Sequence, residues 1–315
     1  MNDKPQIKLS ETVVLIDAAF LNFVITDMKG YFEDILQRSL QEIDLSILTT
    51  YLTLDAGITE GKNEVQFLFV YDKESDQLVH CHPSDLVKEL NGVAFQSPYG
   101  EYSFASVPSE GMVSREDLFL DLLSIVADSA DVKRMIVVSF NEEYGKKVSD
   151  AGFGVLLNFH YSDFWADPGK QIKPKAWKDF DADQLEQAVY EFTEDSLRKV
   201  LEAGVNVTMI QVGNEVTNGL LWPEGLKPNY DNIARFISSG IRACRAVKPE
   251  IPLMIHLDNG GNNEMYRDWF DHYMERGEDF DYIGLSYYPF WHGTLQMLED
   301  NMNDMAARYG KELIV

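Results

Sequence analysis

The residues best suited to chemistry in this chain are Asn214 and Glu215. They follow an apolar run, Met209–Val212, and Gly213, so an amide and a carboxyl stand where a buried strand is predicted to open into its loop. In parallel α/β barrels, active sites are built at this end of the strands. A retaining glycosidase uses such a carboxyl as its acid/base, while the neighbouring amide binds a sugar hydroxyl. For a bare Asn-Glu pair, a loop carboxylate near a helix start is the better interpretation.

The residues that follow the pair favour sugar chemistry. Trp222, Pro223, Glu224 and Gly225 come shortly after Glu215. An indole plane held by proline and glycine, close to an acid, is typical of a platform on which a sugar ring stacks.

Three further predicted strands also end in polar residues. Strand 154–160 ends in His160, strand 252–256 ends in His256, and strand 282–288 ends in Tyr288. Aromatic and polar side chains then follow in the loops: Asp163, Trp165, Asp258, Trp291 and His292. The segment between the first two strands includes an amphipathic helix predicted over 182–203. Strands alternating with such helices predict a parallel α/β architecture.

Four motifs carry a family resemblance. They are HYSDFWADPGKQ (160–171), QVGNEVTNGLLWPEG (211–225), HLDNGG (256–261) and GLSYYPFWHGT (284–294). Through their order and spacing, residues 151–315 resemble the arabinogalactan endo-β-1,4-galactanases of glycoside hydrolase family 53. The resemblance implies a (β/α)8 TIM barrel and retaining, endo-acting hydrolysis of β-1,4-galactan in pectic arabinogalactan. The expected partner is therefore a β-1,4-galactan or arabinogalactan oligosaccharide.

The resemblance also implies roles for individual residues. Glu215 would be the general acid/base, and Asn214 would bind the substrate 2-hydroxyl. A set of polar and aromatic residues would line the sugar cleft: His160, Asp163, Trp165, Trp222, His256, Asp258, Tyr288, Trp291 and His292. Each of these is explained as well by a barrel-mouth residue that packs or caps. No cofactor and no metal is expected. Members of the family usually act outside the cytoplasm, but no secretory signal is recognised here, so the localisation stays open.

The chain departs from the family at its C-terminal end. A retaining glycosidase needs a second carboxylate roughly 5 Å from the acid/base. In the family this nucleophile follows the seventh barrel strand, which here is predicted at Lys311–Val315. We therefore expect the nucleophile to be absent from this sequence, and Glu312 to mark the start of the strand. The predicted fold of residues 151–315 is an incomplete barrel of strands three to seven, without the first two strands, the end of strand seven and strand eight.

Residues 1–150 do not fit the family. All five tryptophans lie at position 165 or later, which indicates a compositional break near residue 150. We predict a small α/β domain of unknown function there. Its elements are expected to be strands at 12–16, 64–71, 77–81 and 133–140 and helices at 28–45 and 114–127, followed by a βαβ-like connection through a helix at 142–150 to the strand at 154. A natural fusion, a mis-joined gene product and a constructed hybrid are all compatible with this pattern.

Two groups in the first half resemble metal ligands. Asp17 at a strand end, with Asp121 and Glu142 as further candidates, resembles the divalent-ion site of acidic nuclease-like domains, but a helix-capping aspartate explains it better. His80 and His82 would share one strand face and could share a metal. No further ligand pair is apparent, so a strand at a loop edge is favoured.

Composition limits the partners. The net charge of −25 in 315 residues argues against nucleic-acid binding, whereas neutral galactan is not repelled. No membrane span is predicted, and Cys81 and Cys244 are expected to be two buried thiols. The alternative to a galactanase is a non-catalytic α/β-domain protein of unknown function that carries a galactanase-like barrel fragment.

Overall fold

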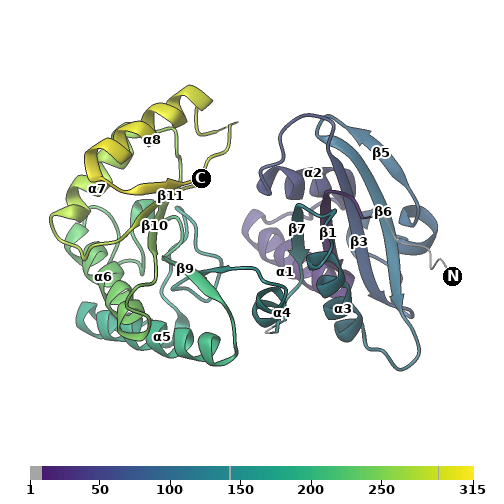
Figure 1. Ribbon diagram of the computed structural model, residues 1–315, viewed down its shortest axis with the longest axis horizontal. Helices are drawn as coiled ribbons and strands as arrows, with labels where there is room; N and C mark the ends of the chain where they lie inside the picture. Colours follow the sequence, from purple (N-terminus) through teal and green to yellow (C-terminus); the bar gives the residue numbers. More distant parts are fainter. Residues whose placement is uncertain (1–8, 142, 290) are drawn as a thin grey trace. The chain divides into compact units, whose positions relative to one another are not determined.

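The computed structural model describes residues 9–141, 143–289 and 291–315. The chain divides into two compact units, Met1–Ala151 and Gly152–Val315 (Figure 1). Each unit has its own five-stranded sheet, and each sheet packs against its own helices.

The first unit contains a mixed sheet in the order β5-β6-β3-β1-β7, in which only β5 is antiparallel to its neighbour. The elements are β1 (Thr12–Asp17), α1 (Ala18–Leu36), β2 (Ile43–Asp44), α2 (Leu45–Asp55), β3 (Glu64–Asp72), β4 (Cys81–His82), the π-helix η1 (Leu86–Leu90), β5 (Ala94–Ser97), β6 (Gly100–Ser109), α3 (Arg115–Ala127), β7 (Arg134–Val138) and α4 (Tyr144–Asp150).

Strand β1 is buried on both faces. Its Val14 and Ile16 belong to the hydrophobic cluster that includes residues of α1 and α2, whereas Val13 and Leu15 belong to the cluster that includes residues of α3. Because successive side chains of a strand point to opposite faces, these two clusters lie on opposite sides of the sheet. The first unit is therefore a three-layer α/β/α sandwich.

Several sequence predictions for this unit need correction. The first helix begins at Ala18 instead of residue 28, because the Asp17 side chain caps it by accepting the N–H groups of Ala19 and Phe20. It ends at Leu36 instead of residue 45. Residues 77–81 do not pair beside β3, whose neighbours are β1 and β6. The helix over 114–127 is confirmed, with the Ser114 side chain accepting the N–H of Asp117.

The βαβ-like connection near residue 150 is also wrong as predicted. Strand β7 belongs to the sheet of the first unit and β8 to that of the second, so α4 does not join two strands of one sheet. Helix α4 itself spans Tyr144–Asp150, and the predicted position 142 lies outside the described residues.

The second unit contains an all-parallel sheet whose strands are arranged in chain order, β8-β9-β10-β11-β12. Strand order of this kind, with helices between the strands, is the pattern of a barrel wall. The elements are β8 (Val155–Phe159), the 3₁₀ turn η2 (Lys175–Trp177), α5 (Ala182–Glu202), β9 (Val207–Val212), the 3₁₀ turn η3 (Val216–Asn218), α6 (Tyr230–Val247), β10 (Leu253–Leu257), α7 (Asn263–Met274), β11 (Tyr282–Leu285), α8 (Leu295–Tyr309) and β12 (Glu312–Ile314).

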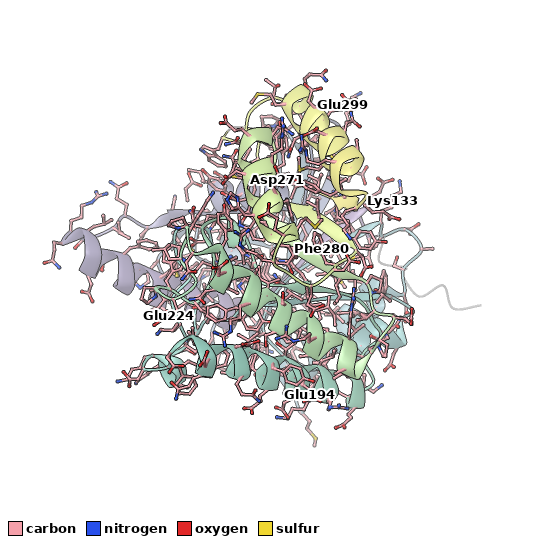
Figure 2. The ribbon with its side chains drawn as sticks, turned by 90° about the vertical axis from the view of Figure 1, so that its left-hand side faces the viewer. Lys133, Glu194, Glu224, Asp271, Phe280 and Glu299 are labelled. Carbon is pink, nitrogen blue, oxygen red and sulfur yellow. The ribbon has the colours of Figure 1, made fainter. Side chains whose placement is uncertain are left out.

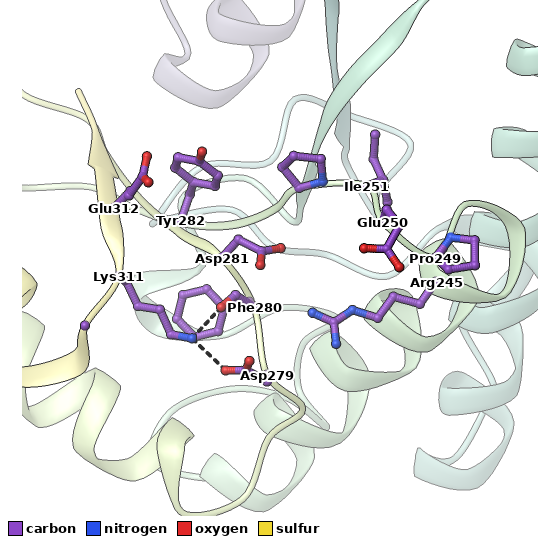
Figure 3. A pocket seen from close by; sticks show the side chains of 12 residues that line it. Arg245, Pro249, Glu250, Ile251, Asp279, Phe280, Asp281, Tyr282, Lys311 and Glu312 are labelled. Carbon is purple, nitrogen blue, oxygen red and sulfur yellow. Dashed lines mark hydrogen bonds and ion pairs between the residues drawn. The ribbon is translucent and has the colours of Figure 1, made fainter.

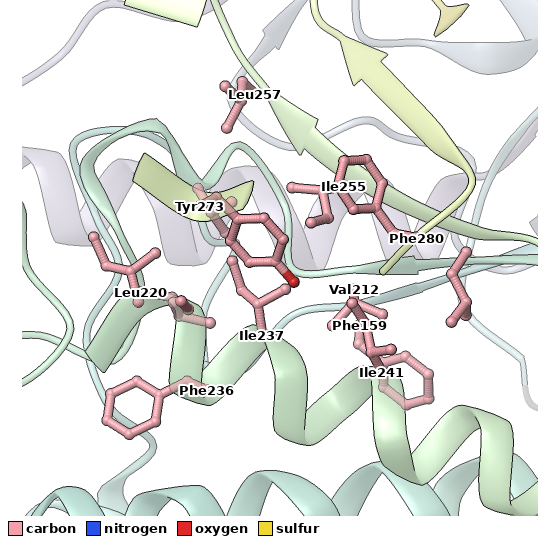
Figure 4. Packing of buried hydrophobic residues seen from close by; sticks show 14 of the residues in the cluster. Phe159, Val212, Leu220, Phe236, Ile237, Ile241, Ile255, Leu257, Tyr273 and Phe280 are labelled. Atoms are coloured by element: carbon pink, nitrogen blue, oxygen red, sulfur yellow. The ribbon is translucent and has the colours of Figure 1, made fainter. Parts of the chain in front are cut away.

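One face of this sheet packs on the helices. Val212, Ile255 and Leu257 from the strands share a cluster with Phe236 and Ile237 of α6, and Figure 4 shows these side chains packed together. The alternate strand positions therefore point to the other face of the sheet. Helix α5 begins one residue after Asp181, which forms a reciprocal capping box with Gln184.

The helices of this unit carry acidic side chains on their outer surface. Figure 2 labels Glu194 of α5, Asp271 of α7 and Glu299 of α8 among these side chains. Within the described ranges, no helix is long and apolar enough to cross a membrane.

Candidate functional site

Polar side chains gather on the sheet face opposite the helices in the second unit. Asn158 of β8, Gln211 of β9 and His256 of β10 occupy the strand positions that alternate with the helix-facing residues. Ser286 follows β11 in the same phase. Because the strands are parallel, their carboxyl ends meet at one edge, and these four residues lie near that edge.

Glu215 stands at this edge in an unusual backbone conformation. It follows β9 and Gly213, and its φ of 46° and ψ of 51° place it in the left-handed region. A non-glycine residue there costs of order 1–3 kcal/mol and is typical of functional sites. The side chain is half-buried.

A short hydrogen-bonded chain of side chains ends on the Glu215 carboxylate. The Ser286 hydroxyl donates to Glu215 Oε1 at 2.6 Å, and the same oxygen of Ser286 lies 3.0 Å from His256 Nε2. The other ring nitrogen, Nδ1, lies 3.1 Å from Gln211 Nε2 and accepts the backbone N–H of Glu215 at 3.3 Å. Both nitrogens of His256 therefore have protein partners.

Burial governs the ionisation of this group. The pKa of Glu215 is raised, chiefly by burial, although the Ser286 hydrogen bond acts in the opposite direction and the charges of Asp258 and Asp167 add to the rise. Burial, together with the charge of the neighbouring His160, lowers the pKa of His256 to about 4. A carboxyl with a raised pKa keeps its proton to higher pH, as a general acid must.

Asn214 is buried and firmly oriented. Its Oδ1 accepts from Gln211 Nε2 at 3.0 Å and from Asn158 Nδ2 at 3.1 Å, while its Nδ2 donates to the carbonyl of Ala166 at 2.8 Å. Gln171 holds the same turn by donating to the carbonyl of Asn214. The amide is thus fixed next to Glu215 by residues from three segments.

His160 and Trp165 lie together in the loop after β8. Their ring centroids are 4.7 Å apart, and Nδ1 of His160 accepts the backbone N–H of Ala166. The Trp165 side chain is 73% exposed, so its indole is accessible from solvent. Asp163, in the same loop, accepts the backbone N–H of Lys175, which is a structural contact.

Asp258 and Trp222 are held by their own loops. The hydroxyl of Thr217 donates to Asp258 Oδ1 and in turn accepts the N–H of Asp258, which ties the loop after β9 to that after β10. The indole N–H of Trp222 donates to the carbonyl of Asn218, leaving the ring partly exposed.

The loop after β11 supplies three more predicted residues. Tyr288 packs edge-on against Trp291 and His292, with ring centroids at 5.8 and 5.4 Å. Trp291 is 66% exposed, and with His292 it borders a hollow of about 590 Å³ that Asn259, Asn262 and Met297 also line. His292 Nδ1 accepts the backbone N–H of Tyr288.

A second hollow, of about 520 Å³, lies at the amino ends of β10, β11 and β12, the edge opposite Glu215 (Figure 3). Lys311 in this hollow donates to the Asp279 carboxylate and to the carbonyl of Phe280. Active sites of barrel folds form at the carboxyl ends of the strands. We therefore do not consider this hollow a candidate active site and interpret its ion pair as a contribution to stability.

In the first unit, the candidate metal ligand Asp17 binds an arginine side chain. Arg115 forms ion pairs with Asp17 at 3.1 Å and with Asp72 at 2.6 Å, so a guanidinium occupies the edge where a cation would bind. Asp121 is exposed, and Glu142 lies outside the described residues.

His80 and His82 also lack a metal-binding arrangement. Cys81–His82 forms strand β4, which pairs with β2. In the described part of the chain, no group of three or more His, Cys, Asp or Glu side chains is placed to hold a metal ion. Cys81 and Cys244 are free and buried, as predicted.

Three residues of the site are missing from the sequence prediction: Asn158, Gln211 and Ser286. All three lie on predicted strands. Asn158 is two residues before His160, and Ser286 is two residues before Tyr288, so each shares a strand face with a predicted site residue. The alternation of strand faces could have indicated them, but their hydrogen bonds join segments far apart in the chain, which spacing does not reveal.

The comparison with protein families agrees with this arrangement. The model of glycosyl hydrolase family 53 matches residues 129–315. The chain belongs to glycosyl hydrolase family 53. Its family match begins earlier than the resemblance predicted from residue 151 and includes β7 and α4. Residues 6–154 match a family of unknown function, DUF6621, so the two matches overlap.

Curated relatives of this family 53 chain include galactanases. It is 38% identical over 187 residues to an arabinogalactan endo-beta-1,4-galactanase of Humicola insolens, covering 56% of each chain. It is 33% identical over 240 residues to one of Thermothelomyces thermophilus, covering 74% of this chain and 70% of the relative. An uncharacterized protein in the bgaB 5' region of Niallia circulans is 46% identical over 178 residues, or 54% of this chain and 49% of that protein. The chain thus spans about half the length of the relatives it matches first.

Solved structures support the family fold. The Ignisphaera aggregans GH53 catalytic domain has a TM-score of 0.55 at 31% identity, covering 72% of this chain and 63% of that one. A structure of fungal beta-1,4-galactanases has a TM-score of 0.52 at 24% identity, covering 97% and 73%, and shows likeness of fold alone. The predicted α/β class and the family are confirmed.

Proposed function

We propose that residues Gly152–Val315 form the acid/base-bearing part of a retaining endo-β-1,4-galactanase, with β8 to β12 as the third to seventh strands of a (β/α)8 barrel. The substrate is β-1,4-galactan of the kind found in pectic arabinogalactan. The observation that carries this proposal is the half-buried Glu215, which has a raised pKa and stands in strained backbone at the carboxyl edge of a parallel sheet. The printed functions of the relatives give the substrate class.

In this function Glu215 protonates the glycosidic oxygen of the leaving galactose. After departure of that sugar, the same carboxylate takes a proton from the attacking water. Burial favours the protonated form needed for the first step. Asn214 already donates one amide hydrogen to Ala166, and its other amide hydrogen binds the substrate 2-hydroxyl.

The exposed aromatic rings form the sugar-stacking surface. Trp165 and Trp291 are 73% and 66% exposed, and an indole face packs well on the apolar face of galactose. Trp222, His160, Tyr288 and His292 complete the cleft. Asp163, His256 and Asp258 already bind protein groups, so we assign them to shaping the cleft.

A retaining mechanism also needs a nucleophilic carboxylate roughly 5 Å from the acid/base. We assign this role to none of the described residues. Glu312 opens β12 at the amino edge of the sheet, away from Glu215, which follows β9. Binding of galactan therefore tests the site more directly than turnover does.

The test combines calorimetric titration with β-1,4-galactotetraose and a reducing-sugar assay on galactan. We expect saturable binding, and any turnover should fall at least about 100-fold in Glu215→Gln, because an acid/base contributes that much. Glu299→Gln, an exposed glutamate of α8, is the matched control and should change neither readout. Absence of binding, or equal turnover in Glu215→Gln, would contradict the proposal and favour the non-catalytic alternative.

For residues 1–150 we propose a separate α/β domain without metal-dependent chemistry. The guanidinium of Arg115 lies between Asp17 and Asp72 at the carboxyl ends of β1 and β3, and this charge neutralises the carboxylates that a divalent ion would need.

A further inference from the structure

The protonation of His256 follows from its hydrogen bonds. Its Nδ1 accepts the backbone N–H of Glu215 at 3.3 Å. The amide nitrogen of Gln211 also lies 3.1 Å from Nδ1, but its two hydrogens bind the carbonyl of Gly213 and Oδ1 of Asn214. Because Nδ1 accepts the backbone N–H of Glu215, it cannot carry a hydrogen of its own. The neutral ring therefore carries its hydrogen on Nε2.

This tautomer fixes the direction of the next two hydrogen bonds. Nε2–H of His256 donates to Ser286 Oγ at 3.0 Å. Since the hydroxyl oxygen accepts on that side, its own hydrogen is turned toward Glu215 Oε1, 2.6 Å away. The order is imidazole, hydroxyl, carboxylate, with each group donating to the next.

We propose that His256 and Ser286 are positioning residues that direct the acidic proton of Glu215 to Oε2. The inference rests on the proposed acid/base role of Glu215 and adds which of its oxygens acts. Oε1 accepts the serine hydrogen and cannot also carry a hydrogen pointing back along the same line. In the protonated acid the hydrogen is therefore on Oε2, which makes Oε2 the oxygen that protonates the leaving group.

The serine hydrogen bond also acts during proton transfer. The Oε2–H bond breaks, its electron pair stays on the carboxylate, and a new O–H bond forms on the glycosidic oxygen. The resulting negative charge is shared with Oε1, where the Ser286 hydrogen bond strengthens as charge develops. Without that donor the acid would release its proton less readily.

Other charged or titratable groups also act on Glu215 and must be considered. Asp258 and Asp167 raise its pKa, and Tyr266 interacts with it electrostatically. His160 and His256 are the nearby imidazoles, and burial disfavours the charged form of both. Among these groups, the Ser286 hydroxyl is the one that favours the carboxylate form of Glu215.

The test is a carbon-13 NMR titration of the side-chain carboxyl in protein labelled at glutamate. The Glu215 resonance is identified by its loss in Glu215→Gln. In Ser286→Ala we expect its titration midpoint to move to higher pH, and Ser286→Thr, which keeps a hydroxyl, should restore the midpoint toward that of the unchanged chain. In His256→Asn the hydroxyl is no longer forced to donate, so the midpoint should move in the same direction as in Ser286→Ala.

Ser196→Ala on α5 is the control for loss of a serine in the same unit. Near-UV circular dichroism of the tryptophans establishes that each variant keeps its packing. A folded Ser286→Ala chain whose Glu215 midpoint stays unchanged, or a midpoint that moves equally in Ser196→Ala, would overturn the inference. The titration needs no substrate, so its failure is separate from failure of galactan binding.

Discussion

The Ser286 hydroxyl donates to Glu215 Oε1 at 2.6 Å and so joins two residues that are 71 positions apart. The contact exists because β9 and β11 run parallel on either side of β10, which brings the turns after them to the same edge. His256 from the central strand lies against both residues, since its ring bonds the Ser286 hydroxyl and the Glu215 backbone. Strands β9, β10 and β11 thus each supply one residue of a hydrogen-bonded group that includes the Glu215 carboxylate.

His256 should make the stability of the second unit depend on pH. Burial lowers its pKa from 6.5 to about 4, so the unfolded chain binds its proton more readily than the folded one. The stabilisation is present above pH 6.5 and is lost as pH falls toward 4, in total on the order of 3 kcal/mol. Urea unfolding followed by tryptophan fluorescence measures it, since all five tryptophans lie in this unit.

The comparison with His256→Gln tests that contribution, together with the upward move of the Glu215 midpoint that loss of the imidazole is expected to cause. Glu215 acts in the opposite sense, because its raised pKa gives stability that is lost as pH rises. Between pH 7 and pH 4.5, the unfolding free energy of the unchanged chain should therefore fall more than that of His256→Gln. Parallel pH profiles would show that the imidazole is not buried as described.

Gly284→Ala should destabilise the second unit by about 1–3 kcal/mol, because it overpacks the sheet. The added Cβ would lie 2.8 Å from Met254 Sδ and 3.1 Å from His256 Cδ2. Gly30→Ala, in the exposed middle of α1 with no atom within 4 Å of the new carbon, should instead stabilise the first unit by up to about 1 kcal/mol. Chemical denaturation of both variants is the measurement, and a neutral Gly284→Ala would contradict the close packing of the imidazole.

Arg115→Met should cost the first unit about 3 kcal/mol, because Asp17 is then left buried beside no cation. Adding Asp17→Asn should recover most of the loss, since asparagine also caps helices and carries no charge. Thermal unfolding by far-UV circular dichroism gives both values. If Arg115→Met melts at the temperature of the unchanged chain, the ion pair contributes nothing to stability.

Trp165→Ala and Trp291→Ala should each weaken binding of β-1,4-galactotetraose by about tenfold, since a stacking aromatic contributes of order 1 kcal/mol or more. Phe153→Ala serves as the control, because that exposed ring precedes the amino end of β8, the edge opposite Glu215. Calorimetric titration checks the affinities. Equal affinity in both exposed variants would show that sugar binds elsewhere.

Much of the second unit was predictable from the sequence. The apolar runs before His160, Gly213, His256 and Ser286 each form the expected strand, and the helix predicted over 182–203 is α5, Ala182–Glu202. These predictions succeed because one face of every strand and helix must be buried, which leaves a clear periodicity. The family followed from four motifs in order.

The first unit was less predictable for a physical reason. Strands such as β1 are buried on both faces, so their apolar runs carry no alternation, and the sheet order cannot be deduced from them. Helix α1 was placed late because its cap, Asp17, is also the last residue of a strand. In the site, roles that depend on distant partners, as in Ser286, were not visible in spacing.

Strand β10 carries two different constraints on alternate residues. Leu253, Ile255 and Leu257 face the helices, while Met254 and His256 face the site. A systematic substitution scan should therefore give two interleaved patterns along five consecutive codons: tolerance of other large aliphatic residues at the odd positions, and strict chemical identity at 256. Insertion of a single residue into β10 would turn the aliphatic side chains toward the site and His256 toward the helices. Both the folding of the second unit and the hydrogen bonds that control the Glu215 proton would then be lost.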